Sequence, residues 1–170
     1  MELKLFLLTL LSLHVIANFH GIEENRNPCP ESWIQATFVD MGCLLINRTE
    51  TLTWEEAHKS CQAEENASLV EILTTDQMDY LQMELISIEE FIGPAYYWTG
   101  GTDHGREGRW IWMYSLESVE DFVWYNGPSD KQPNGGSDAN CLYLHPDKYN
   151  YEGCDWDCTG KYYPICQKFM

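Results

Sequence analysis

Cysteines constrain the fold of this chain more than any other residue type. Seven of them follow an apolar leader, at Cys29, Cys43, Cys61, Cys141, Cys154, Cys158 and Cys166. Cysteines form disulfides in oxidising compartments, and an odd number leaves one thiol without a partner in the same chain. The sequence therefore predicts a domain braced by disulfides, with one cysteine left over.

Residues 1–17 predict a secretory signal peptide, because Lys4 lies in a short polar start and an apolar run follows over residues 5–13. The run is short for a bilayer span, so we expect no membrane anchor. Cleavage leaves a lead-in at residues 18–28 and one domain at residues 29–167. We therefore expect a secreted, extracellular protein.

The sequons and the net charge agree with secretion. Asn47-Arg48-Thr49 and Asn66-Ala67-Ser68 predict N-glycosylation at Asn47 and Asn66. The formal net charge is −17 at pH 7. Such an acidic surface repels nucleic acid and anionic lipid, so neither is an expected partner. It suits cation binding, although solubility alone accounts for most of these carboxylates.

The first half of the domain carries helical patterns. A hairpin is expected over residues 29–46. Thr53 and Glu56 form a capping-box pattern at the start of one helix, and Thr74 is the expected cap of a second. The inward stripe of the second helix consists of Met78, Leu81 and Leu85.

The second half of the domain carries strand patterns separated by turns. Short runs rich in aromatic and β-branched residues predict strands at residues 96–101, 109–114, 122–126, 141–144 and 162–167. Helices followed by strands argue for an α+β fold. Residues 127–139 and 146–156 show no regular pattern, and long loops inside a compact domain are usually functional or disordered.

Several short motifs in this order are similar to a known family. They are "CPESW", "TWEEAHKSC", "YYWTGGTD", "EGRWIW", "QPN" and "CTGKYYPIC". The chain resembles the C-type lectin-like domain family, in its long form with an added N-terminal hairpin. The resemblance implies two helices, two small antiparallel sheets and a long ligand-binding loop, braced by disulfides.

The resemblance also implies how the cysteines pair. The implied bridges are Cys29–Cys43, Cys61–Cys166 and Cys141–Cys158. Cys154 is then left without a mate, either as a buried free thiol or as the link of a disulfide-bonded homodimer.

The long loop is the implied ligand site. In sugar-binding members, the residues on either side of a cis proline hold calcium and bond two sugar hydroxyls. Here these residues are Gln132 and Asn134, on either side of Pro133, and Asp155 matches a further ligand. Calcium takes about six to eight oxygen ligands, so a diol can complete the shell. Tyr149, Tyr151 and Trp156 are candidates for stacking on the sugar ring.

The match to the family's calcium site is incomplete. Ala139 and Cys154 stand where the family has a glutamate and an asparagine. Asp138 is a candidate replacement carboxylate, and Trp156-Asp157 is a second candidate if the loop shifts register. Asp103 and Glu107 have the spacing of an accessory calcium site, although a solvated acidic pair is the more frequent origin of such a pattern.

Two functions of different classes follow. The first is a calcium-dependent lectin that binds glycans or glycoproteins, mannose-type or galactose-type, in recognition of microbial or self surfaces. The second is a calcium-independent domain that binds a protein or another non-sugar ligand through the same loop. Catalysis is not expected, since the sequence lacks G-x-S-x-G and H-E-x-x-H motifs. A zinc site from His145, Cys154 and Cys158 conflicts with the disulfide implied for Cys158.

Overall fold

The computed structural model describes residues 29–120, 122–146 and 150–169. The expected signal peptide, residues 1–17, and the lead-in, residues 18–28, lie outside the described residues. No helix in the described ranges is both long and apolar enough to cross a bilayer.

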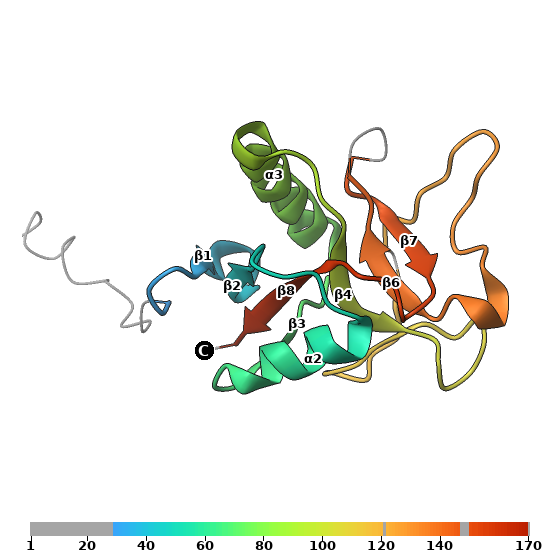
Figure 1. Ribbon diagram of the computed structural model, residues 1–170, viewed down its shortest axis with the longest axis horizontal. Coiled ribbons are helices and arrows are strands. Elements are labelled where there is room, and N and C mark those ends of the chain that lie inside the picture. Colours follow the sequence, from blue (N-terminus) through green and yellow to red (C-terminus); the bar gives the residue numbers. More distant parts are fainter. Residues whose placement is uncertain (1–28, 121, 147–149, 170) are drawn as a thin grey trace, which may run out of the picture.

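Within the described residues, the domain consists of two α-helices and a mixed sheet (Figure 1). Helix α2 covers Trp54–Ala63 and helix α3 covers Thr75–Ile92. The strands are β1 (Ile34–Ala36), β2 (Gly42–Ile46), β3 (Ala67–Leu69), β4 (Tyr97–Thr102), β5 (Ile111–Trp112), β6 (Cys141–Leu144), β7 (Gly153–Trp156) and β8 (Tyr163–Lys168). Two short 3-10 turns are η1 (Thr37–Val39) and η2 (Gly136–Asp138).

Strand β8 joins two groups of strands. It pairs antiparallel with β2 and β3, and parallel with β4. The main strand order is β1-β2-β8-β4-β6-β7, with β5 on β4. The two small antiparallel sheets expected from the resemblance are therefore connected through one parallel pair. Figure 1 shows α2 and α3 on opposite sides of β8.

The helices begin where their caps predict. Thr53 Oγ1 accepts a hydrogen bond from Glu56 N at 3.3 Å, and Glu56 Oε2 accepts one from Thr53 N at 2.9 Å, which completes the capping box of α2. Thr74 Oγ1 accepts from Gln77 N at the start of α3. Both predicted caps are confirmed.

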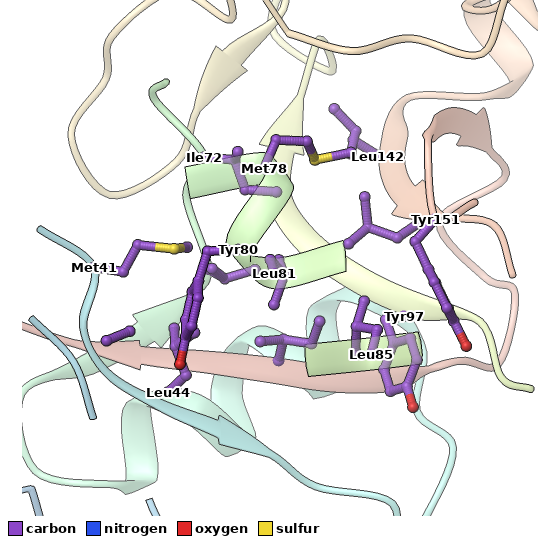
Figure 2. Close-up of a cluster of buried hydrophobic side chains, with 14 of the residues drawn as sticks. Met41, Leu44, Ile72, Met78, Tyr80, Leu81, Leu85, Tyr97, Leu142 and Tyr151 are labelled. Atoms are coloured by element: carbon purple, nitrogen blue, oxygen red, sulfur yellow. The ribbon is translucent and has the colours of Figure 1, made fainter. Parts of the chain in front are cut away.

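The stripe of α3 packs into the larger core. Met78, Leu81 and Leu85 are buried, as predicted. Figure 2 shows these side chains gathered with Tyr97 and Leu142 in one cluster. Burial of a side chain of this size contributes about 1.5–3 kcal/mol, so this face fixes α3 against the sheet.

The structure contains the three disulfides that the resemblance implies. The Cys61–Cys166 bridge joins α2 to β8 over a sequence separation of 105 residues. In the chain-entropy account, a loop of this length stabilises the folded state by about 4.7 kcal/mol. The bridge therefore holds the helix against the last strand.

One strand prediction was wrong, and another was too long. Residues 122–126 form only isolated bridges, and the rings of Phe122 and Trp124 pack on Trp112 and Trp110. The predicted strand at residues 109–114 shortens to β5. Conversely, β7 forms in the interval expected to be a loop. Its first residue is Gly153, and glycine has a low strand propensity. Glycine fits at this position because a Cβ would lie 2.1 Å from the Phe122 ring.

Candidate functional site

The long loop and the ends of β6 and β7 enclose one open pocket of about 370 Å³, which we call the loop pocket. Ligand sites commonly begin at about 300 Å³. Gln132, Asn134, Asp138 and Asp155 all line it. The structure therefore brings three predicted ligands and one predicted replacement carboxylate to the same place.

Asp155 ties the loop to strand β7. Its side chain is 4% exposed, and its two carboxylate oxygens accept hydrogen bonds from Asn134 N at 3.0 Å and Gly135 N at 2.7 Å. Asp155 N in turn donates to Gln132 Oε1 at 3.2 Å. Each of these oxygens keeps a further lone pair for a ligand or an ion. The peptide bond between Gln132 and Pro133 is cis, as the resemblance implies.

Gly135 permits the close approach of the loop to Asp155. A Cβ at this position would lie 2.2 Å from the Ala139 Cβ and 3.0 Å from Asp155 Oδ2. Ala139 is buried beside it. Glycine at position 135 therefore allows the loop to pack against the carboxylate of Asp155.

Asp130 is a site residue that the sequence analysis missed. Its Oδ1 accepts hydrogen bonds from Asn134 Nδ2 at 2.5 Å and from Gln132 Nε2 at 3.3 Å, and the residue lines the loop pocket. One carboxylate therefore contacts both carboxamides. One feature of the sequence could have indicated this role: Asp130 precedes Gln132 by two positions. A local turn can place such a residue against the Gln-Pro-Asn motif.

Trp156 is the aromatic residue best placed for a ligand. Its side chain is 49% exposed and lines the loop pocket, where Tyr143 and His145 form part of the wall. Tyr151, a second candidate, is buried in the core and donates its hydroxyl to Glu89 Oε2 at 2.8 Å, so that prediction was wrong. Tyr149 lies outside the described residues.

Cys154 is unpaired and buried, with 3% of its surface exposed. Burial raises the pKa of its thiol to about 12. Of the two alternatives left by the sequence, the structure favours the buried thiol over an exposed intermolecular link. Cys158 belongs to a disulfide, which removes it from any zinc site with His145. Among the described residues, no group of three histidine, cysteine or acidic side chains is placed to hold a metal.

Asp103, from the predicted accessory site, is buried near the loop pocket. It is 2% exposed; its Oδ2 accepts from Gly108 N at 2.8 Å, and its Oδ1 has no hydrogen-bond partner among the described residues. Burial raises the pKa of this carboxyl above its ordinary value, and the Asp155 carboxylate adds to the shift. Glu107, its predicted partner, is exposed.

The donor set suits a hard cation better than a transition metal. The pocket offers carboxylate and amide oxygens, which are the ligands that calcium prefers. Asp103 and Asp155 are both buried, and neither takes part in an ion pair within the described part of the chain. Buried carboxylates without a positive partner are costly, and backbone N–H groups bond to both of these carboxylates.

The disulfide-braced α+β fold and the loop pocket define a C-type lectin-like domain. Residues 50–168 match the family described as the lectin C-type domain, and the chain belongs to that family. Domains of this family generally bind ligands and do not catalyse reactions.

The curated relatives are longer than this chain. C-type lectin domain family 9 member A of Rattus norvegicus is 31% identical over 145 residues, which cover 85% of this chain and 52% of the relative. CD209 antigen-like protein C of Mus musculus is 29% identical over 143 residues, or 83% of this chain and 70% of the relative. The chain thus spans about half the length of the first of these proteins.

Solved structures share the fold. The C-type lectin domain of murine dendritic cell inhibitory receptor 2, solved in complex with an N-glycan, aligns with a TM-score of 0.68 and 21% identity, over 84% of this chain and 100% of that one. A calcium-independent type II antifreeze protein aligns with a TM-score of 0.67 and 20% identity, over 86% and 98%. At these identities the likeness shows the fold alone.

Proposed function

We propose that this domain recognises glycans through the loop pocket, with a calcium ion held by Gln132, Asn134 and Asp155. The observation that carries the proposal is the convergence of these side chains. Asp155 bonds to Asn134 across 21 residues and to Gln132 across 23 residues of sequence, on the wall of one pocket. Such convergence of polar groups in a concave site is typical of ligand binding.

The residues of the pocket divide the work of binding. Calcium, when bound, supplies a positive centre that attracts two neighbouring sugar hydroxyls. Gln132 and Asn134 would hold the ion through their amide oxygens. Each NH2 group donates one hydrogen to Asp130 and would have its second hydrogen available to a sugar hydroxyl. Asp130 and Asp138, which both line the pocket, supply negative charge in place of the glutamate replaced by Ala139. Trp156 offers its ring to the apolar face of the sugar.

The biological setting belongs to the same proposal. Three disulfides favour an oxidising compartment, so we infer secretion and action outside the cell. Recognition of microbial or self glycans fits that setting. Membership of the lectin C-type domain family supports sugar as the ligand class. The Gln-Pro-Asn motif does not select between mannose-type and galactose-type ligands.

Specific observations favour a second candidate, calcium-independent binding of a protein or another non-sugar ligand. Ala139 and Cys154 replace two expected ligands, and both are buried. Asp155 already bonds to the backbone of Asn134 and Gly135, and Asp130 bonds to both carboxamides, so the loop is organised by protein groups alone.

Retention on immobilised mannose and galactose tests the first candidate. We expect retention on one resin in millimolar calcium, elution by chelator, and loss of retention for Gln132→Ala. Gln35→Ala, which removes an exposed carboxamide from β1, is the matched control and should be retained like the wild type. Lack of retention on both resins, together with no heat of calcium binding in calorimetry, would reject the calcium-dependent lectin and favour the second candidate.

A further inference from the structure

A second pocket of about 410 Å³ lies between helix α2 and the turn that follows β5. His58 and Gln62 of α2 and Asn66 line one part of it, and Met113 and Tyr114 line another. We call it the Asn66 pocket. Its wall therefore combines polar side chains that can bond hydroxyl or amide groups with two apolar side chains.

The apolar part of this pocket is exposed to solvent. Tyr114 is 60% exposed and Met113 is 41% exposed, and Leu116 in the same turn is 68% exposed. Tyr114 also stacks on Phe169, with ring centroids 5.6 Å apart. Clustered apolar side chains on the surface of a soluble domain usually mark a contact with something else.

Buried groups hold this turn in place. Glu71 is buried, and its Oε1 accepts hydrogen bonds from Tyr114 N at 2.6 Å and Ser115 N at 3.0 Å. Leu116 has a φ of 62°, in the left-handed region that is unfavourable for a non-glycine residue. A buried carboxylate and a costly backbone conformation thus present Met113 and Tyr114 outward in a fixed geometry.

Asn66 can carry a covalently attached group that would occupy the Asn66 pocket. It is exposed, has a φ of 57° in the turn between α2 and β3, and is the acceptor of the sequon Asn66-Ala67-Ser68. We propose that Asn66 carries an N-linked glycan whose first sugar lies in the Asn66 pocket against Tyr114 and Met113.

The modification joins Asn66 Nδ2 to C1 of the first N-acetylglucosamine of a lipid-linked oligosaccharide diphosphate. The bond from C1 to the diphosphate oxygen breaks, the diphosphate leaves with that electron pair, and the amide nitrogen loses one proton. The sugar then presents CH groups to the Tyr114 ring and Met113, and hydroxyl and acetamide groups to Gln62 and His58.

Covalent attachment makes even a weak contact of this kind effective. A tethered group binds as if present at high concentration, because its attachment point lines the pocket. Asn47 offers a contrast within the same chain. Its Oδ1 accepts from Thr49 N at 3.0 Å and from Thr49 Oγ1 at 2.7 Å, and it does not line the Asn66 pocket.

Glycan trimming on the folded, secreted protein tests the proposal. Peptide mass spectrometry should find a glycan on Asn66. An endoglycosidase that leaves one N-acetylglucosamine should keep the melting temperature, whereas an amidase that removes the whole glycan should lower it by about 2–4 °C and increase the binding of a hydrophobic dye. The amidase leaves aspartate at position 66, so Asn66→Asp should match its product. Asn66→Gln should show the same loss without the added charge, and Asn47→Gln should stay close to the wild type in both readouts.

The Tyr114→Ala variant tests whether the glycan stabilises the fold by contacting Tyr114 or only by making the protein surface more soluble. In the glycosylated protein it should lower the melting temperature by more than it does in the Asn66→Gln background, because only the former loses the sugar contact. Equal losses in both backgrounds would overturn the proposal, as would an unmodified Asn66. A dimer that buries Tyr114 in the wild type would overturn it too. These outcomes are independent of retention on mannose and galactose resins, which tests the loop pocket.

Discussion

Asp130 Oδ1 lies 2.5 Å from Asn134 Nδ2, so a carboxylate outside the Gln-Pro-Asn motif holds a side chain inside it. A carboxylate only accepts hydrogen bonds and therefore selects the NH2 end of the amide. The same oxygen also accepts from Gln132, so one acidic residue orients both carboxamides of the loop pocket.

Asp130→Asn tests whether the charge of Asp130 matters beyond its hydrogen bonds. The asparagine keeps an acceptor oxygen but loses the negative charge, so we expect calcium affinity to fall by about 10- to 100-fold, as for residues that support metal ligands. Calorimetry measures the affinity. Asp79→Asn removes an equal charge from an exposed position on α3 and should leave the affinity unchanged. Equal affinities for all three proteins would show that Asp130 acts only as an acceptor.

Ala139→Glu should strengthen calcium binding. Ala139 lines the loop pocket, so a longer acidic side chain can extend into it and add a charged ligand. We expect a gain of about tenfold or more, corresponding to roughly 1.4 kcal/mol. Ala139→Gln, which has the same length without the charge, should give little gain. A gain of the same size in both variants would contradict a role for charge.

Cys154 should react slowly with thiol reagents in the folded protein. It is buried, and its pKa is raised to about 12, whereas the thiolate is the reactive form. We expect alkylation by iodoacetamide at pH 8 to be about a hundredfold or more slower in buffer than in denaturant, measured by intact mass. Rapid labelling of the native protein, or a disulfide-linked dimer on a non-reducing gel, would instead place this sulphur at the surface.

Asp103 should make stability depend on pH in the absence of calcium. Its folded pKa is raised, so the folded state binds the proton more tightly and the free energy of unfolding falls as pH rises through that pKa. Asp103→Asn removes this penalty, and we expect its melting temperature in chelator to exceed that of the wild type by about 2–4 °C at pH 7. The difference should shrink at acidic pH, where the wild-type carboxyl is protonated. A constant difference at all pH values would rule out titration of Asp103 as the cause.

The sequence predicted those parts of the fold that depend on local patterns. The Thr53 cap depends on residues three positions apart, and the buried stripe of α3 depends on helical periodicity. Strand β7 depends instead on a distant partner. Its residues Gly153 and Asp155 have little intrinsic strand preference, and pairing with β6 overrides this.

The candidate site was predictable only where a family motif marks it. Gln132, Asn134 and Asp155 follow from such a motif, and the structure brings them together. Asp130 has no place in that motif, and its contact with the carboxamides arises from the path of the loop. Tyr151 was placed at the site because it is near Asp155 in sequence, but its ring turns into the core.

The position of β8 has a practical consequence for displaying this domain on a support. The β1–β2 hairpin pairs with β8, so the start and the end of the described chain lie on one side, while the orange loop containing η2 lies on the other (Figure 1). Attachment at residue 29 or residue 169 would therefore hold the domain at the side away from η2, whose Asp138 lines the loop pocket. Dense arrays of copies tethered in this way would present many loop pockets to one surface, and linked sites bind more tightly than a single site.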